Sequence, residues 1–418
     1  MSAFCGLDFG TSNSTIGVVK NNVYELVLLE NNSPIIRSAV FCDLEIQKLI
    51  FGQKAIDGYL EGVPGRLLMS LKSVLGSSLM TEKTYVFNEF VPYTNILAQF
   101  VNYLKIKAEE NLNTPITQVV LGRPVYFHDD NPHKDALAQN TLEMIAHDLG
   151  FKEVSFQYEP IAAALSYEAT IKKEQLALIV DMGGGTSDFT VIRLHTNVKN
   201  TDRSKDVLSN SGIHIAGTDF DKKLSLNSVM PLLGMGSMMK GSSSDIVFPP
   251  GCYHDLATWH LLTGLYDAKN IAHIRTMLSV SYEKDLIERF IAVLENKAGH
   301  QILNAVEIAK KKLSDLSDYQ MDLSFIENNL SLVVLRKAFN DTISTELEKI
   351  VSTIKKTIVE AGVTFSDIDA VFYTGGSTKI PLVREKINVL LPNADLIQGD
   401  AFGSVGLGLT IDAKRKYG

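Results

Sequence analysis

The sequence predicts an α/β protein with two related lobes that face one site. The prediction depends on a pattern that occurs twice: an apolar strand, an acidic residue, a Gly-rich turn with hydroxyls, and a second apolar strand. The first copy spans residues 4–20 and carries Asp8, and the second spans 176–194 and carries Asp181. Apolar β-branched runs around such turn residues are typical of β-hairpins. Two hairpins so far apart in the chain indicate one hairpin in each lobe.

The two turns contain the residue types that bind phosphate. Glycine lets backbone N–H groups approach a phosphate closely, and Thr and Ser hydroxyls add donors. An Asp at the strand end would lie near a Mg²⁺ ion, directly or through water, because this ion keeps several waters when it bridges phosphates. One such turn is more often an ordinary hairpin. Two copies with matched Asp, Gly, Thr and Ser favour a nucleotide-binding site.

The other elements of the first half alternate between short strands and helices. Apolar residues at helical spacing predict a helix over 96–112, which ends at the stop signal Asn113-Thr114-Pro115. An Ala-rich helix is expected at 160–170, because Pro160 would lie in its first turn, where proline is favoured. Further strands are expected at 4–9, 15–20, 23–29, 36–42 and 117–122, and a further helix at 134–149, closed by Gly150.

The second half is predicted to be mostly helical, with two irregular segments. Residues 195–212 are polar and read as a loop, and 228–255 are rich in Gly, Met and Ser and read as a surface loop. The glycines and Lys240 of the second segment do not have the G-x-x-x-x-G-K-[ST] spacing of a phosphate loop. The expected regular elements are a helical region at 256–314, a helix at 341–360, a strand at 370–374, and helices at 382–391 and from about 401.

Composition narrows the class of protein. The net charge of −8 and the isoelectric point of about 5.7 argue against nonspecific binding to nucleic acid or to an anionic membrane. The three cysteines, Cys5, Cys42 and Cys252, have neither metal-ligand spacing nor an even-numbered disulfide framework, which fits a reducing compartment. No signal-like start and no uninterrupted apolar run of about 18 residues occurs. We therefore expect a cytoplasmic protein.

Five motifs in order along the chain resemble those of the actin, sugar-kinase and heat-shock ATPase superfamily. Within it the sequence is most similar to the nucleotide-binding domain of DnaK-type heat-shock chaperones, and its length resembles the truncated YegD-type relatives. The five motifs are the first phosphate motif at 6–14, the connecting motif at 158–167, the second phosphate motif at 181–188, a third motif at 217–221 and the adenosine motif at 372–381.

The resemblance implies an actin-like ATPase fold. Each of its two lobes would be built on a ribonuclease-H-like mixed sheet with flanking helices, with the nucleotide in the cleft. Lobe I would comprise residues 1–173 with 400–418 returning to it. Lobe II would comprise 174–399, including a divergent helical subdomain at about 222–306. In a departure from the full chaperones, the sequence stops at Gly418 with no hydrophobic linker after the ATPase motifs, so we expect no C-terminal peptide-binding domain in this chain.

The resemblance also implies roles at the phosphate side of ATP or ADP. Lys72 matches the catalytic lysine that stabilises the attacking water and the developing charge, and Thr186 matches a hydroxyl near the γ-phosphate. Asp8, Asp181 and Glu159 would organise Mg²⁺, mostly through its waters. Such a set suits phosphoryl transfer, which needs positioning and charge neutralisation more than covalent help. The residues that would hold the β- and γ-phosphates are Gly10, Thr11, Ser12, Asn13, Gly183, Gly184 and Gly185.

A second set of residues is implied at the adenosine side. Lys379 occupies the place of an arginine that stacks on adenine, and a lysine cannot reproduce that planar stacking. Asp400 matches the acid that begins the final helix, where its alternative role is an N-cap. The third motif contributes Gly217. The ribose-binding helix and the adenosine motif would contribute Glu307, Lys310, Lys311, Ser314, Gly375, Gly376 and Ser377.

Some positions depart from the family pattern. The family's allosteric switch pairs a proline with a downstream arginine; Pro124 is present, but no arginine follows nearby. Thr218 replaces a glutamate of the third motif. Four functions stay open. The first is a slowly hydrolysing, chaperone-like ATPase that responds to a protein client or co-chaperone and closes its lobes on nucleotide. The second is a nucleotide-gated interaction module without turnover. The third is a small-molecule kinase, whose acceptor-side Asp base we cannot identify. A filament of actin-like subunits is a fourth alternative.

Overall fold

The computed structural model describes residues 3–418 apart from 88, 129–130, 169, 197–202 and 398–402. The chain forms two compact units. The first comprises Met1–His214, Ser352–Thr378 and Ile387–Gly418, and the second comprises Ile215–Val351 and Lys379–Lys386. The lobe boundary expected near residue 173 stays a prediction.

The first predicted hairpin lies at the centre of a mixed sheet in the first unit. Its strands are β1 (Ala3–Phe9) and β2 (Asn13–Lys20), and the sheet order is β11-β10-β1-β2-β3, with the short β4 (Ile36–Arg37) beside β2. β1, β2 and β3 (Val23–Leu26) are antiparallel, whereas β10 and β11 run parallel to β1. The last two strands are β10 (Ile116–Arg123) and β11 (Glu153–Tyr158).

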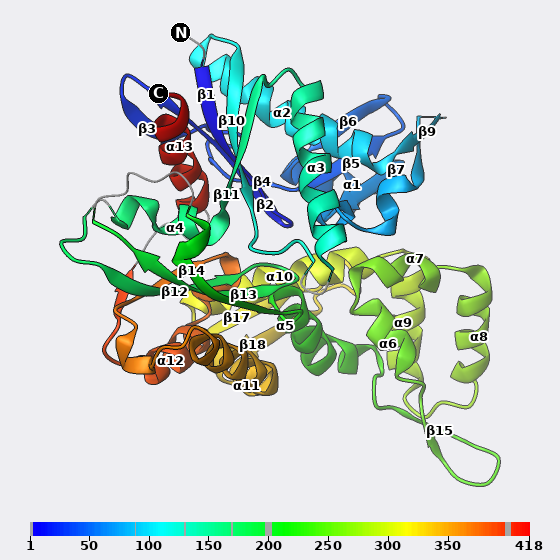
Figure 1. The fold of residues 1–418 in the computed structure, drawn as a ribbon. Helices are drawn as coiled ribbons and strands as arrows, with labels where there is room; N and C mark the ends of the chain where they lie inside the picture. The colour runs from blue at the N-terminus through cyan, green and yellow to red at the C-terminus, as the bar shows by residue number, and fades with distance from the viewer. Residues whose placement is uncertain (1–2, 88, 129–130, 169, 197–202, 398–402) are drawn as a thin grey trace. The chain divides into compact units, whose positions relative to one another are not determined.

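The second predicted hairpin forms the centre of another sheet with the same plan (Figure 1). Here the order is β14-β13-β12-β19-β20, in which the first three strands are antiparallel and the last two run parallel to β12. Asp8 and Asp181 therefore occupy equivalent places, each near the end of a central strand. The strands are β12 (Gln175–Met182), β13 (Ser187–Leu194), β14 (Val207–Ile213), β19 (Ala370–Thr374) and β20 (Asp395–Ile397).

Helices of the first unit pack against the two sheets. Apolar residues of α2 (Tyr93–Leu112) and α3 (Pro132–Asp148) pack with strands of the first sheet in one core. α4 (Glu159–Glu168) and α13 (Ser404–Tyr417) share a second core with residues of both sheets. α13 approaches α4 very closely, because a Cβ on Gly408 would lie 1.8 Å from the carbonyl oxygen of Ala162.

Smaller elements fill the rest of the first unit between Ala39 and Pro92. β5, β6 and β7 form a three-stranded antiparallel sheet, and β8 and β9 form a hairpin. Lys72 lies on the short helix η1. The bounds are β5 (Ala39–Asp43), β6 (Lys48–Phe51), α1 (Gln53–Leu60), β7 (Gly65–Met69), η1 (Leu71–Val74), η2 (Ser78–Thr81), β8 (Lys83–Val86), β9 (Glu89–Pro92) and, between β13 and β14, η3 (Ser204–Asp206).

The second unit is mainly helical, as the sequence predicts for 256–314. Two long helices, α11 (Arg336–Glu360) and α12 (Pro381–Leu390), include residues of both units. The other elements of the second unit are α5 (Gly217–Leu224), η4 (Ser225–Val229), η5 (Met230–Leu233), β15 (Met238–Met239), β16 (Ile246–Val247), α6 (Gly251–Leu256), η6 (Trp259–Leu261), α7 (Leu262–Leu265), α8 (Ala268–Leu278), α9 (Lys284–Glu295), α10 (Gly299–Asp315), β17 (Asp318–Asp322) and β18 (Ser331–Leu335). In the chain, η7 (Phe365–Asp367) precedes β19, and η8 (Gly376–Lys379) follows it.

Two loop predictions are wrong. The polar segment 195–212 contains most of β14, whose Ser209 donates to the Thr357 carbonyl at 2.7 Å and whose Ser211 donates to Glu360 at 2.9 Å. These side chains are polar because they bond to α11. The segment 228–255 is no surface loop either, because Met230 and Phe248 are fully buried.

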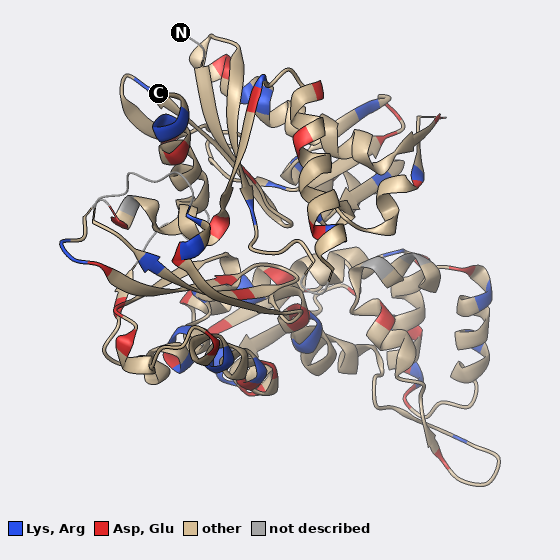
Figure 2. Ribbon diagram, viewed as in Figure 1, with Lys and Arg blue, Asp and Glu red and all other residues tan. Residues whose placement is uncertain are grey.

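The start of α11 also differs from the prediction. α11 begins at Arg336 rather than near 341, and the described part of the last helix begins at Ser404, whereas the predicted start near 401 lies outside the described residues. Figure 2 shows Lys and Arg interspersed with Asp and Glu along α11. In the part of the chain that the structure describes, no helix combines the length and the apolar character that a membrane crossing requires.

Candidate functional site

The two Gly-rich turns approach each other within the first unit. A Cβ on Gly184, in the second turn, would lie 2.5 Å from the Ser12 hydroxyl oxygen in the first turn. A side chain at position 184 would have to displace the Ser12 hydroxyl, so the glycine lets the two turns approach each other closely. The structure thus brings together two segments that lie about 170 residues apart and that the sequence predicts to hold phosphates.

Hydrogen bonds within the protein fix the backbone of the first turn. The Gly10 N–H donates to the Ser14 hydroxyl at 3.2 Å, and the Ser38 hydroxyl donates to the Gly10 carbonyl at 2.7 Å. The two hydroxyl oxygens lie 2.9 Å apart and are buried. A turn held in this way keeps its shape without a ligand. The side chains of Thr11, Ser12 and Asn13 remain partly exposed at its edge.

The second turn is fixed by the adenosine motif. The Ser377 hydroxyl donates to the Gly183 carbonyl at 2.7 Å, and the Gly183 N–H donates to the Thr186 carbonyl at 3.0 Å. Gly375 has a φ of 79°, a left-handed conformation that glycine adopts readily, and a Cβ there would lie 2.3 Å from the Met182 carbonyl oxygen. Gly183, Gly375, Gly376 and Ser377 are therefore close together, while Gly185 and Thr186 are exposed.

Lys72 and Glu159 form a short ion pair. Lys72 Nζ lies 2.6 Å from Glu159 Oε1, and only 10% and 14% of the two side chains are exposed. η1 positions Lys72, and Glu159 is the first residue of α4. Nζ also lies 5.9 Å from the centre of the Phe127 ring, within the range of a cation–π contact.

Electrostatics link this pair to the two aspartates. Burial raises the pKa of Asp8 to about 8; the charges of Glu159 and Asp181 add to the increase, whereas Lys72 opposes it. Burial and the charges of Glu159 and Asp188 likewise raise the pKa of Asp181 to about 7, again against Lys72. Although burial lowers the pKa of Lys72, the charges of Glu159, Asp8 and Asp181 outweigh burial and raise it. The lysine therefore stays charged.

This donor set fits a hydrated Mg²⁺ ion. Four carboxyl groups influence one another with Lys72 as the cation among them, so a divalent cation would relieve their repulsion. Among the described residues no three Asp, Glu, His or Cys side chains gather closely enough to bind a metal directly. A magnesium ion here would keep several waters, as it commonly does beside phosphates.

Sequence reasoning assigned no role to one member of this group. Asp188 lines a cavity of about 30 Å³ together with Glu159 and Asp181. Two further lining residues, Thr190 and Asn210, are joined by a hydrogen bond of 2.7 Å between the Thr190 hydroxyl and the Asn210 side-chain oxygen. The signal was available in β13, where Asp188 and Thr190 place polar groups at alternate positions of an otherwise apolar strand.

The predicted ribose-binding residues lie in the second unit and make contacts within it. Glu307, Lys310, Lys311 and Ser314 follow one another at helical spacing on α10. Lys310 Nζ donates to the Gly217 carbonyl at 2.9 Å and pairs with Asp221 at 2.6 Å, whose second oxygen is buried without a hydrogen-bond partner. Glu307 pairs with Lys311 at 2.8 Å. The structure therefore joins Gly217 to the predicted helix through Lys310.

Two predicted adenosine contacts are less defined. Lys379 is exposed at the end of η8, and Asp400 lies outside the described residues. At the family's switch position, Pro124 lines the cavity. The arginine before it, Arg123, donates to the Pro124 and Val125 carbonyls at 3.1 and 3.2 Å and pairs with Asp135 at 2.9 Å.

Comparisons with known proteins agree with this geometry. A family model described as "Hsp70 protein" matches residues 4–229 and 263–400. The chain is 25% identical over 432 residues to a protein of Shewanella sp. (strain MR-4), and 25% identical over 429 residues to one of Pseudoalteromonas atlantica; each is named "Chaperone protein HscA homolog". Both alignments cover 98% of this chain and 57% of the relative, so the chain spans little more than half the length of the curated relatives it matches.

The family match covers most of the chain. It confirms the predicted resemblance to DnaK-type chaperone nucleotide-binding domains and the predicted α/β, actin-like fold class of two lobes. The repeated sheet order of the first unit agrees with that class. The chain belongs to the Hsp70 protein family.

Proposed function

We propose that this protein binds ATP with Mg²⁺, hydrolyses it slowly, and uses the nucleotide state to control lobe closure in a chaperone-like role. The observation that supports the proposal most directly is the Lys72–Glu159 pair, which lies within electrostatic reach of Asp8 and Asp181. This constellation supplies a cation, metal-organising carboxylates and two Gly-rich turns.

Each residue has a role that follows from its surroundings. The backbone N–H groups and hydroxyls of the two turns would bind the β- and γ-phosphates. Lys72 would stabilise charge that develops on the phosphoryl group, and Glu159 would orient the attacking water and keep the ammonium group in place. The metal ion, when bound, would neutralise phosphate charge. Asp8 and Asp181 would hold its waters.

The chaperone-like role rests on the family and on its relatives. The matched proteins are named chaperones, which supports a protein client or a co-chaperone as the partner. The proposed adenosine contacts are Glu307, Lys310, Lys311, Ser314 and Lys379. A lysine in place of a stacking arginine predicts weaker adenine binding.

Single-turnover phosphate release tests the proposal. Wild-type protein is mixed with ATP and Mg²⁺, and the rate is compared with that of Lys72→Ala. We expect wild-type hydrolysis and a loss of about a hundredfold or more in the variant, because a preorganised charge at the reacting group is removed. Lys107→Ala is the matched control, since this lysine pairs with Glu110 on the surface of α2.

The other outcomes are equally informative. An unchanged rate in Lys72→Ala would refute the catalytic assignment. Tight ATP binding without hydrolysis in the wild type would refute the ATPase and favour the nucleotide-gated interaction module. ATP-dependent phosphorylation of an added sugar would favour the small-molecule kinase.

A further inference from the structure

Helix α4 links the proposed catalytic pair to a buried ion cluster at its other end. Glu159 is its first residue and Glu168 is its last. The helix has 10 residues and is therefore about 15 Å long. Only 2–3% of the Glu168 and Arg203 side chains is exposed, so both charges are desolvated and each needs its partner.

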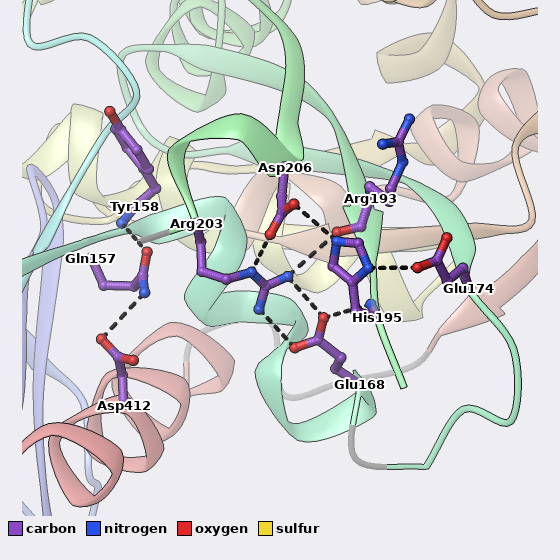
Figure 3. Close-up of polar contacts among 9 residues, drawn as sticks. All are labelled: Gln157, Tyr158, Glu168, Glu174, Arg193, His195, Arg203, Asp206 and Asp412. Atoms are coloured by element: carbon purple, nitrogen blue, oxygen red, sulfur yellow. Dashed lines mark hydrogen bonds and ion pairs between the residues drawn. The ribbon is translucent and has the colours of Figure 1, made fainter. Parts of the chain in front are cut away.

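Arg203 binds Glu168 through two guanidinium nitrogens (Figure 3). Nη1 lies 2.9 Å from Glu168 Oε2, and Nη2 lies 2.8 Å from Glu168 Oε1. The third nitrogen, Nε, donates to Asp206. Two parallel bonds to one carboxylate fix both the position and the orientation of Glu168.

The cluster also attaches Glu168 to the second sheet. The His195 N–H, directly after β13, donates to Glu168 Oε1 at 2.8 Å. The His195 ring lies 2.9 Å from both Asp206 and Glu174 (Figure 3). Burial opposes the ionisation of Asp206, but hydrogen bonds from Arg203 and His195 outweigh burial and lower its pKa. Asp206 therefore remains an anion that holds Arg203.

The body of α4 can transmit a constraint from one end to the other. Ile161, Ala162, Ala163, Ala164 and Leu165 are all at most 4% exposed, and Gly408 of α13 packs against Ala162 without space for a Cβ. Close-packed interiors are stiff. A shift of the Glu168 end must therefore displace the rest of the helix, including Glu159.

We infer that Arg203 is a positioning residue: it anchors the end of α4 through Glu168 and so sets where Glu159 meets Lys72. The effect on rate rests on the proposed ATPase function, whereas the anchoring itself does not. A purely structural role would change the stability of the fold and leave the Lys72–Glu159 geometry intact.

Arg203→Lys tests the inference. Lysine keeps the charge but cannot donate to both Glu168 oxygens from a planar fork while it bonds Asp206. We expect single-turnover phosphate release to fall by about tenfold to a hundredfold, because small misplacements reduce rates by such factors. The dissociation constant for ATP should stay equal to that of the wild type.

The double variant Arg203→Lys/Glu159→Gln separates positioning from stability. If Arg203 acts through Glu159, it has no further effect on the rate once Glu159 is replaced. Independent effects would multiply instead. Multiplied effects would overturn the inference.

Hydrogen exchange of the α4 amides provides a measurement that does not need hydrolysis. We expect faster exchange at residues 163–168 in Arg203→Lys and no change in Arg289→Lys, whose arginine pairs with Glu327 in the second unit. Should Arg203→Lys fail to fold, Asp206→Asn removes the second carboxylate that holds Arg203, together with the charge beside His195, and is expected to show the same pattern.

The two proposals fail in different ways. If the α4 amides exchange faster in Arg203→Lys but the wild type does not hydrolyse ATP, the ATPase proposal is refuted and the anchoring of α4 by Arg203 is retained. Wild-type hydrolysis with unchanged α4 exchange in Arg203→Lys would refute the anchor and retain the ATPase.

Discussion

Lys72 is the cation among the carboxyl groups Asp8, Glu159, Asp181 and Asp188. Burial raises the pKa of Asp8 and of Asp181, and the neighbouring carboxylates add to the increase, which Lys72 opposes only in part. A divalent cation would offset the charge of these carboxylates and that of a phosphate chain bound beside them. The composition alone could not show this, because the residues come from four separate segments.

His300 carries a prediction at the residue scale. It lies on α10, is 7% exposed and has the Trp259 ring 4.7 Å from its own ring. Burial lowers its pKa to about 4, below the value near 6.5 of an unfolded histidine. The unfolded chain therefore binds the proton first as the pH falls from about 6.5 to about 4. The stability that the neutral His300 ring contributes to the fold is complete above about pH 6.5, and it is lost as the pH falls from about 6.5 to about 4.

We expect acid to lower the free energy of unfolding through this group by roughly 2 kcal/mol at pH 5. Urea denaturation at pH 7.5 and at pH 5 would measure it. His300→Gln should lose this part of the pH dependence, whereas His273→Gln, at an exposed position of α8, should retain it. Equal pH dependence in the wild type and His300→Gln would contradict the assignment.

At the scale of elements, local sequence patterns predicted those strands and helices whose residues also favour that secondary structure in their tertiary surroundings. The two hairpins combine apolar strands with turn residues, and both form as expected. β14 escaped prediction because its Ser209 and Ser211 are polar for a tertiary reason: they bond to α11, more than 140 residues away. Asn210 of the same strand was missed at the cavity for the same reason.

The contact between α4 and α13 supplies a prediction for Gly408. A methyl group there would meet the Ala162 carbonyl carbon and oxygen, which are backbone atoms and cannot rotate away. We expect Gly408→Ala to lower the free energy of unfolding by about 3 kcal/mol or more, at the upper end of overpacking costs. Gly264→Ala is the control, because this glycine lies on the short helix α7 with no atom near its Cβ position.

The measurement is the denaturant midpoint of each variant. Gly264→Ala should match or slightly exceed the wild type, since alanine favours helix. If Gly408→Ala were as stable as the wild type, the close approach of the two helices would be wrong. The sequence predicts the Ala-rich helix α4, but it gives no local signal that Ala162 would need a glycine, Gly408, as its packing partner.

At the scale of the whole molecule, the repeated sheet order explains why two copies of one motif can serve a single ligand. Each sheet has an aspartate near the end of its central strand, followed by a Gly-rich turn, and the two turns meet at Gly184 and Ser12. The roles of these residues in nucleotide binding stay predictions. A ligand that binds both turns would bind the folded chain and not the unfolded one.

Ligand binding should therefore stabilise the fold by mass action. At an ATP concentration about a hundredfold above its dissociation constant, the free energy of unfolding should rise by about 2.7 kcal/mol. Thermal melts with increasing ATP, in Mg²⁺ and in a chelator, would measure it. The rise should be largest with Mg²⁺, because the carboxylates around Lys72 repel a phosphate chain that lacks a counterion.

Asp8→Ala and Asp181→Ala decide what a rise in melting temperature means. Each variant removes one carboxylate whose pKa the others raise, so its own fold is expected to be no less stable at neutral pH, while the Mg²⁺-dependent part of the ATP effect should disappear. If the Mg²⁺-dependent rise in melting temperature persists in both variants, the nucleotide binds elsewhere on the chain. A wild-type melting temperature that stays flat across the titration would contradict nucleotide binding by this site. The equivalent positions of the two aspartates add a finer expectation: the Mg²⁺ effect should disappear to the same extent in both variants, because each aspartate lies near the end of the central strand of one of two sheets with the same order.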